Sequence, residues 1–416
     1  MNSENSELIL TKNEKLSLDE LLHEKGLSNY DVIIEAGSQK GDNFMGKIAR
    51  IIIKTTTTPE LKLILKCSIR NGEFRTIFPH NRMFQREIFM YTKYLPELYK
   101  IQCTNQLQNG LMPVPHVHKY SWKDCNEFIL MDDMKHHGYE MLDRRKYLNM
   151  DHCKLVLHQL AHFHGLGFVM KHTQPQLFEK WSSDKQTNMI ASNLLRNTSY
   201  EQKLMEMFTR ASLALDPFTD EDILRKFLAY KNSMLKNLMD LEDPEQKDNY
   251  CVFVHNDCWI NNLLFQYENS SKIIPKKLCL IDWQISNINS PIKDVSYFLY
   301  QSTDPNLLTE NFSKLMDYYY EQLTECIEKC HLSIETVYPY DIFEKHLKRY
   351  MRHGVHYMII TGALHLSNED EIPNHTMNMD KDRFTEDTLN IRSKNDQLYN
   401  LRIRGVIKHA ILNNFL

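Results

Sequence analysis

The sequence lacks the apolar segments that direct a chain to a membrane or hold it there. The N-terminal stretch, MNSENSELILTKNEK, is polar and has no apolar core of the signal-peptide kind. No window approaches the ~20 consecutive apolar residues that cross a bilayer. We therefore expect a cytoplasmic protein that makes no membrane contact.

Paired cysteines are also missing. The nine cysteines are odd in number and scattered, and no CxxC pair occurs. Cys326 and Cys330 lie one helical turn apart, which we interpret as two buried thiols rather than a bridge. This usage is typical of a reduced, intracellular protein.

A basic tract is absent too. The chain has 50 Lys and Arg against 54 Asp and Glu, a formal charge of −4. That balance lacks the electrostatic footprint of a nucleic-acid or anionic-membrane partner, and no protein partner is implied. At ~150 residues per domain, 416 residues leave room for two lobes or domains.

The most informative stretch begins at Cys251 and reads CVFVHNDCWINNLLFQY. Its first four residues are apolar and β-prone, and they predict a short buried strand. His255 and Asp257 follow, and Asn262 stands five residues after Asp257. Phosphoryl transfer from a nucleotide uses such a pair: the Asp accepts or orients the acceptor hydroxyl, and the Asn holds a metal ion.

A second acidic position follows at the interval that a kinase-like site requires. Leu278–Ile281 is another apolar strand, and it ends at Asp282. In kinase-like sites a metal-chelating Asp occupies this place. Either motif alone would fit an ordinary turn at a strand end. Two motifs in this order and spacing, each after a buried strand, indicate a kinase-like fold.

Upstream, the pattern predicts a cover for nucleotide phosphates. Asp31–Glu35 and Gly46–Lys54 are predicted strands, and a glycine-containing turn with Gly41 and Asn43 joins them. Strand, glycine turn and strand is how kinase-like folds present backbone N–H groups to phosphates. A plain hairpin is the alternative interpretation of this segment alone.

The third predicted strand, Leu61–Lys66, supplies a candidate lysine. Lys66 lies nearer the strand end than its rival Lys62, so it is preferred for contact with the α and β phosphates. Its positioning carboxylate is expected to be Glu87, beside the apolar stripe of a helix near Arg82–Leu95. A solvated acid on the helix surface is the alternative for Glu87.

Two further strands, Pro113–Trp122 and Glu127–Met131, bring the N-terminal sheet to about five antiparallel strands. The composition then becomes turn-like from Asp132 to Met134, which predicts the hinge. Backbone groups hold an adenine at such a hinge, so Asp132 and Met134 are the candidate contacts for the base.

These patterns together predict an α+β, two-lobed protein kinase-like fold, with a small antiparallel β lobe and a larger, mostly helical lobe. Residues 1–131 would form the nucleotide-binding lobe, and residues 132–416 the helical lobe with the acceptor pocket. Ser17–Glu20 fits a capping box that begins a short helix ending near Gly26.

Features of two other protein classes are absent. A helix is predicted from Pro291, soon after Asp282 and without an APE sequence, so no room remains for a peptide-docking activation segment. The acceptor is therefore expected to be a small molecule, and Asp294 is expected to cap and anchor that helix. His158 and His162 have metal-ligand spacing, but no HExxH acid accompanies them and their neighbours favour a buried helix.

At these motifs the sequence resembles the insect ecdysteroid kinase-like family, within the wider group of aminoglycoside phosphotransferases and choline kinases. The resemblance is carried by GDNF at Gly41–Phe44, by HNDCWINNLLF at His255–Phe265 and by DWQ at Asp282–Gln284. It spans about residues 30 to 370.

The resemblance implies an ATP- and Mg²⁺-dependent phosphotransferase that acts on a hydroxyl of a small molecule, such as an ecdysteroid or a related steroid. His255 would brace the catalytic loop by hydrogen bonding. The remaining roles are Asp257 as catalytic base, Asn262 and Asp282 as Mg²⁺ ligands, and Lys66 with Glu87 on the nucleotide phosphates.

One position departs from the family pattern. Asn256 stands where the family usually has glycine, and asparagine tolerates left-handed backbone better than other non-glycine residues. The alternative function is a pseudokinase that binds nucleotide or a hydrophobic ligand without turnover.

Overall fold

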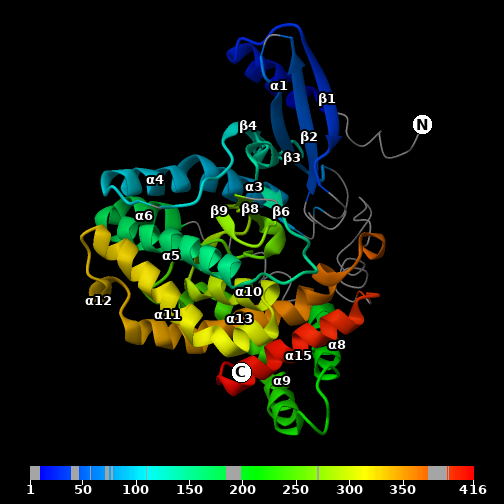
Figure 1. The fold of residues 1–416 in the computed structure, drawn as a ribbon, viewed down its shortest axis with the longest axis vertical. Helices are drawn as coiled ribbons and strands as arrows, with labels where there is room; N and C mark the ends of the chain where they lie inside the picture. The colour runs from blue at the N-terminus through cyan, green and yellow to red at the C-terminus, as the bar shows by residue number, and fades with distance from the viewer. Residues whose placement is uncertain are drawn as a thin grey trace.

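The N-terminal part is a five-stranded antiparallel sheet, and helices form most of the remainder (Figure 1). The predicted α+β, kinase-like architecture, with a small antiparallel β lobe and a larger helical lobe, is confirmed. Its division between residues 131 and 132 stays a prediction. The computed structural model describes residues 10–38, 46–56, 58–70, 75, 78–108, 110–183, 198–268, 271–372, 391 and 393–416.

The sheet has the order β1-β2-β3-β5-β4, and each neighbouring pair is antiparallel. Alternation along the central strands buries one face, as the sequence predicts for Leu61–Lys66. The strands are β1 (Tyr30–Ala36), β2 (Gly46–Thr55), β3 (Leu61–Ser68), β4 (Val117–Ser121) and β5 (Phe128–Asp132).

Helix α1 (Lys12–Glu24) packs leucines against the buried face of the sheet, but it begins earlier than predicted. The prediction of a capping box at Ser17–Glu20 was wrong. Thr11 and Glu14 form the box instead, and Arg70 donates to the buried Glu14 carboxylate at 2.5 Å. The earlier start adds nearly two helical turns and pairs a buried acid, which explains why it prevails.

Strand β4 is shorter than the predicted Pro113–Trp122, because it begins only at Val117. Pro113 and Pro115 have no N–H to donate to a sheet, so the ladder starts after them.

The helix predicted near Arg82–Leu95 does not end there. It begins as α3 (His80–Phe89), widens into the π-turn η2 (Met90–Tyr94) and continues as α4 (Leu95–Thr104). Pro96 lacks the N–H that an α-helix would bond one turn back, and the wider turn accommodates that loss.

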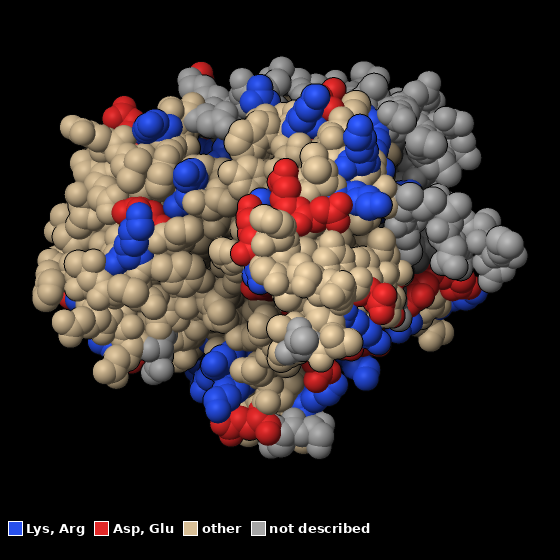
Figure 2. Space-filling view, turned by 90° about the horizontal axis from the view of Figure 1, so that it is seen from above, with Lys and Arg blue, Asp and Glu red and all other residues tan. Residues whose placement is uncertain are grey.

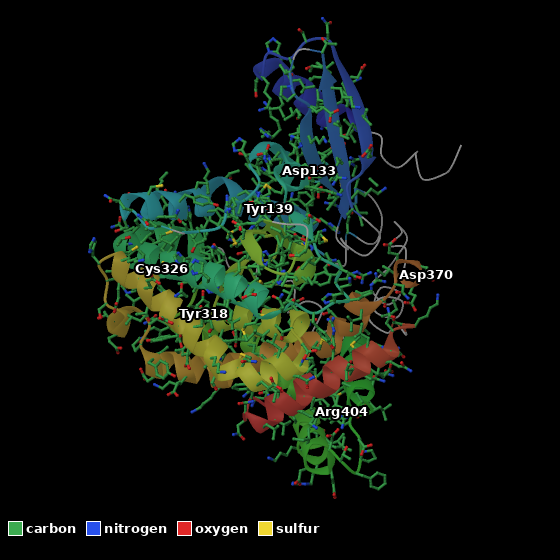
Figure 3. The ribbon with its side chains drawn as sticks, in the orientation of Figure 1. Asp133, Tyr139, Tyr318, Cys326, Asp370 and Arg404 are labelled. Carbon is green, nitrogen blue, oxygen red and sulfur yellow. The ribbon has the colours of Figure 1, made fainter. Side chains whose placement is uncertain are left out.

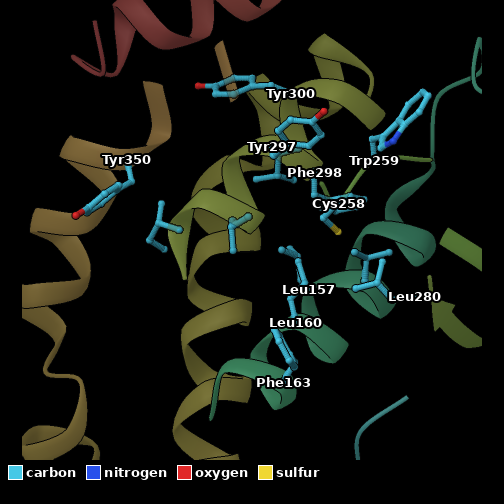
Figure 4. Packing of buried hydrophobic residues seen from close by; sticks show 14 of the residues in the cluster. Leu157, Leu160, Phe163, Cys258, Trp259, Leu280, Tyr297, Phe298, Tyr300 and Tyr350 are labelled. Atoms are coloured by element: carbon cyan, nitrogen blue, oxygen red, sulfur yellow. The ribbon is translucent and has the colours of Figure 1, made fainter. Parts of the chain in front are cut away.

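Two pairs of packed helices form the centre of the larger lobe. Helix α5 (Met150–Thr173) packs on α11 (Pro305–Lys329), and α10 (Ile292–Ser302) packs on α13 (Tyr340–Leu366). Figure 4 shows side chains of α5 and α10 meeting in this core. The outer helices are α6 (Pro175–Ser182), α8 (Thr198–Ser212), α9 (Glu221–Glu242), α12 (Ile334–Val337) and α15 (Asp396–Leu412).

Two small sheets lie between the large sheet and these helices. Strand β7 (Val252–Val254) pairs with β10 (Asn287–Asn289). Strand β8 (Leu263–Tyr267) lies between β6 (Glu140–Met141) and β9 (Pro275–Leu280). The predicted strands before Asp257 and Asp282 are thus present, and they bring the two acidic loops together.

The surface and the cysteines add two observations. Acidic and basic side chains are intermixed on the face in Figure 2. Cys326 and Cys330 are free and buried, as predicted. Among the described helices, none has the length and apolar character needed to cross a bilayer.

Candidate active site

A cavity of about 740 Å³ lies between the five-stranded sheet and the helical lobe. Gly41 and Asn43, two of the predicted site residues, lie outside the described residues. Six other predicted site residues line the cavity: Lys66, Glu87, Asp132, Met134, Asn262 and Asp282. Residues far apart in the sequence therefore meet at one place.

Lys66, on β3, forms ion pairs with two carboxylates that line the cavity. Its Nζ lies 2.7 Å from Glu87 Oε2 and 2.7 Å from Asp282 Oδ1. Burial would lower the pKa of Lys66, but the charges of Asp282 and Glu87 outweigh it and raise that pKa above its usual value. The ammonium group therefore stays charged. Lys62 lies nearer solvent and pairs with Glu60 instead.

Glu87 is held inside the lobe by α3 and is only 1% exposed, which rules out the alternative of a solvated surface acid. Burial raises the pKa of Glu87 to about 7, and the charge of Lys66 opposes that rise. Tyr91 lies one turn after Glu87, and its hydroxyl points toward the loop that contains Asp282. The backbone N–H of Asp282 donates to that hydroxyl at 3.4 Å.

Asp257 lies in the loop after β7, beside the cavity. The Asn262 side-chain N–H group donates to the Asp257 carbonyl at 2.8 Å and to its carboxylate at 2.9 Å. Burial raises the pKa of Asp257 to about 7; the charge of Asp282 adds to the rise, and hydrogen bonds from Tyr297 and Asn262 oppose it. Asp257 is thus poised to exchange a proton near neutral pH.

Asp294 anchors this loop through contacts that the sequence did not indicate. Its two carboxylate oxygens accept the backbone N–H groups of His255 at 2.7 Å and Asn256 at 2.6 Å. His164 lies 3.1 Å from the same carboxylate. The prediction that Asp294 caps its own helix was wrong: the N-cap of α10 is Pro291, and the carboxylate points at the neighbouring loop.

The environment of Asp294 keeps it ionised. Burial alone would raise its pKa, but His164 and the backbone N–H of Asn256 outweigh burial and lower the pKa below its usual value. The sequence signal was available in part, since an acid in the first turn of a mostly buried, aromatic-rich helix needs a partner.

His255 braces the same loop from its other side. Its Nε2 donates to the carbonyl of Ile281 at 2.9 Å, and its Nδ1 accepts the backbone N–H of Asp257 at 3.2 Å. Burial lowers the pKa of His255, so the ring stays neutral and can accept at one nitrogen while it donates at the other. The imidazole ties the Asp257 loop to the strand end before Asp282.

Two of these loop residues have left-handed backbone. Asn256 has a φ of 69° and Asp282 a φ of 68°. Residues other than glycine adopt this region at some cost and cluster at functional sites when they do. Asparagine at the family's glycine position therefore keeps the conformation that glycine would have.

We expect Asn256→Gly to leave the loop intact and to change the free energy of unfolding by no more than about 1 kcal/mol, because glycine adopts this φ freely. The change also removes a buried Asn256 Oδ1 that has no hydrogen-bond partner in the described structure. Asn29→Gly, at an exposed position with φ 57°, is the matched control. Chemical denaturation measures both, and a loss well above 1 kcal/mol for Asn256→Gly would contradict the reasoning.

The predicted hinge contains an ion pair that the sequence did not suggest. Arg50 of β2 lies 2.6 Å from the carboxylate of Asp133, and both residues line the cavity. Asp133 is labelled in Figure 3. The carboxylate of Asp132 lies 2.7 Å from His118 Nε2, and the backbone N–H of Asp132 donates to the carbonyl of His116. Any contact between Asp132 and a base would therefore use its remaining groups.

The residues present fit a magnesium ion. Asn262 and Asp282 bring a carboxamide oxygen and a carboxylate to the same cavity, and Mg²⁺ prefers such oxygen ligands. In the part of the chain that the structure describes, no group of three or more His, Cys, Asp or Glu could hold a metal ion. Mg²⁺ commonly takes one or two protein ligands and completes its shell with phosphates and water.

Comparison with known families decides the assignment. The sequence matches the description "Ecdysteroid kinase-like family" over residues 40–332, which include the loops of Asp257 and Asp282. The chain belongs to the ecdysteroid kinase-like family. This membership supports a small-molecule phosphotransferase of the kinase-like fold.

Two of the solved structures that this chain matches are described as phosphotransferases. A protein from Ralstonia eutropha described as an aminoglycoside phosphotransferase shares 11% identity, with a TM-score of 0.44 and coverage of 95% of this chain and 96% of that one. A GDP complex of a mutant aminoglycoside 2'-phosphotransferase-IIIa shares 13% identity, with a TM-score of 0.40 and coverage of 96% and 98%. A comparison with curated protein sequences finds no match.

Proposed function

We propose that this ecdysteroid kinase-like chain transfers the γ-phosphoryl group of Mg-ATP to a hydroxyl of a small molecule. The observation that carries the proposal is the buried Lys66, held between Glu87 and Asp282 at 2.7 Å each. A charged, fixed lysine beside two acidic loops is the arrangement that nucleotide phosphates need.

Each residue has a proposed part in the transfer. Asp257 aligns the acceptor hydroxyl and takes its proton, while Asn262 and Asp282 hold Mg²⁺, which offsets phosphate charge when bound. Lys66, positioned by Glu87, contacts the phosphates. Asp132 and Met134 adjoin the base, and Gly41 and Asn43 cover the phosphates.

The acceptor is proposed to be a ring-containing alcohol such as an ecdysteroid or a related steroid. Family membership supports this choice, and so do the aromatic rings near Asp257. Trp259 stacks on His365 with ring centres 3.8 Å apart, and Tyr297 hydrogen-bonds the Asp257 carboxylate. We place the reaction in the cytoplasm.

The test is phosphate transfer from labelled Mg-ATP to a panel of small alcohols. The panel contains ecdysteroids, sterols, choline-like amines, phenols and glucosides. We expect label on the steroid alcohols. Label on another class would overturn the acceptor assignment alone. Nucleotide binding without label on any compound would favour a pseudokinase over the proposed enzyme.

The rate should depend on pH through Asp257. Only the carboxylate form can take a proton, so kcat/KM should fall about tenfold per pH unit below the pKa of about 7 and level off above it. Bound Mg²⁺ would offset the Asp282 charge that adds to this pKa, so the acid limb of kcat should lie at lower pH. The profile of kcat/KM at limiting Mg-ATP reports the enzyme without the metal, and the profile of kcat at saturating Mg-ATP reports the enzyme with it. A kcat/KM that is flat across neutral pH would exclude Asp257 as the base.

A further inference from the structure

A second cavity, of about 1300 Å³, adjoins the first, since Pro115 lines both. The segment 110–117, η2, α4, α5, β9 and α11 form its wall. Within the described residues, that wall includes none of Lys66, Asp257, Asn262 and Asp282. Ligand cavities commonly measure about 300–1,000 Å³, so this space is sufficient for a drug-sized molecule.

The wall is mostly apolar and is held in place by hydrogen bonds. The Tyr99 hydroxyl donates to the Met112 carbonyl at 2.5 Å, and the Leu111 N–H donates to the Gln102 side chain at 2.5 Å. These bonds fix the segment that faces α5 and α11. The apolar side chains and rings of the wall include Tyr91, Tyr99, Leu111, Met112, Leu155 and Tyr318, the last of which is labelled in Figure 3.

One polar atom in this wall needs a partner. Gln159 of α5 is 8% exposed, and its Oε1 accepts no hydrogen bond from any part of the chain that the structure describes. A buried carbonyl oxygen without a donor is unfavourable. Its neighbour His158 is instead bound to Gln322 at 2.6 Å across the same cavity. This oxygen is itself shielded from solvent, but Gln159 lines the cavity, so rotation of its side chain would let a ligand O–H or N–H donate to the oxygen.

Tyr91 connects this cavity with the other one. Its ring lines the second cavity, and its hydroxyl accepts the backbone N–H of Asp282 at 3.4 Å. Asp282 lines the first cavity and has left-handed backbone. A ligand that moves the Tyr91 ring therefore acts on the position of Asp282.

We propose that the second cavity is a binding site for a mostly apolar aromatic molecule that donates one hydroxyl or N–H hydrogen bond to Gln159. Tyr91 couples its occupancy to nucleotide binding at Asp282. The binding part of the proposal stands independently of phosphoryl transfer.

The test uses anilinonaphthalene sulfonate, an aromatic probe with one N–H, and the full chain saturated with a non-hydrolysable ATP analogue. We expect saturable binding to one site, about tenfold weaker in Leu155→Trp, which fills the cavity, and about fivefold weaker in Gln159→Leu. Leu235→Trp replaces a partly buried leucine on α9 and should bind as the wild type does. Thermal melts verify that each variant is folded. Equal affinity in Leu155→Trp and Leu235→Trp would overturn the site.

The coupling is tested by the ratio of probe affinities with and without the analogue. We expect a limiting ratio of at least about twofold in the wild type and a ratio near one in Tyr91→Phe, which keeps the ring but removes the hydroxyl. A ratio of one in the wild type would overturn the coupling. A ratio that keeps growing with analogue concentration would indicate direct competition and would place the probe in the first cavity.

Discussion

Asp257→Asn is expected to reduce phosphoryl transfer by about 10³-fold or more while leaving the dissociation constant for Mg-ATP within a factor of about three. The carboxamide keeps the shape of the side chain but cannot take the proton of the acceptor hydroxyl. Labelled-phosphate transfer and nucleotide titration measure the two quantities. Asp317→Asn, at an exposed position on α11, is the matched control and should change neither.

The same substitution should stabilise the nucleotide-free protein. The pKa of Asp257 is about 7, against an ordinary ~3.9, so ionisation of this carboxyl costs folding free energy as pH rises between these values. Above about pH 7 the Asp257→Asn variant should therefore be more stable than the wild type by about 1–3 kcal/mol, and below about pH 4 this difference should vanish.

Thermal melts at pH 4 and pH 8 measure this stability difference. Full activity in Asp257→Asn would remove Asp257 from the mechanism. If activity is lost but stability at pH 8 does not increase, ionisation of the buried Asp257 carboxyl group does not cost the folding free energy that we predict.

Asp294→Ala is expected to cost about 3–5 kcal/mol of unfolding free energy and to abolish transfer, because it leaves two buried backbone N–H groups and His164 without their acceptor. The groups affected are those of His255 and Asn256, which precede Asp257 directly. Asp294→Asn should also be damaging, since one of its two atoms would present N–H to a backbone N–H.

Asp304 provides a matched comparison for Asp294. It also accepts two backbone N–H groups, at 2.8 and 3.2 Å, but at the N-terminus of α11, nearer to solvent. Asp304→Ala should therefore cost only about 1 kcal/mol and leave transfer unchanged. Denaturant unfolding and transfer assays on both variants test the comparison. Equal losses of unfolding free energy in Asp294→Ala and Asp304→Ala would show that the burial of Asp294 does not account for its larger contribution to stability.

Much of the architecture could be predicted from local pattern. Alternating apolar residues in Leu61–Lys66 and the apolar runs before Asp257 and Asp282 identify strands, because strand periodicity is a property of a few neighbouring residues. Family membership could likewise be inferred from short motifs. The element boundaries were less accurate: α1 begins nearly two turns early, and the helix near Arg82–Leu95 passes through a π-turn.

The local sequence pattern did not predict the boundary of a helix correctly where two positions could each begin it. Thr11–Glu14 and Ser17–Glu20 both have the residue spacing of a capping box, but only Thr11 and Glu14 form one, and Glu14 is buried beside Arg70. Sequence spacing alone contains no information about which acid becomes buried.

The sequence by itself determined the order of the motifs, the kinase-like family and the identities of the charged residues. Tertiary structure alone decided which of them meet. Lys66 and Asp282 are 216 positions apart and share an ion pair, and Asp294 serves a loop 38 positions before it rather than its own helix. Such contacts depend on how separate elements pack, because burial and charge pairing arise only when distant segments are brought together.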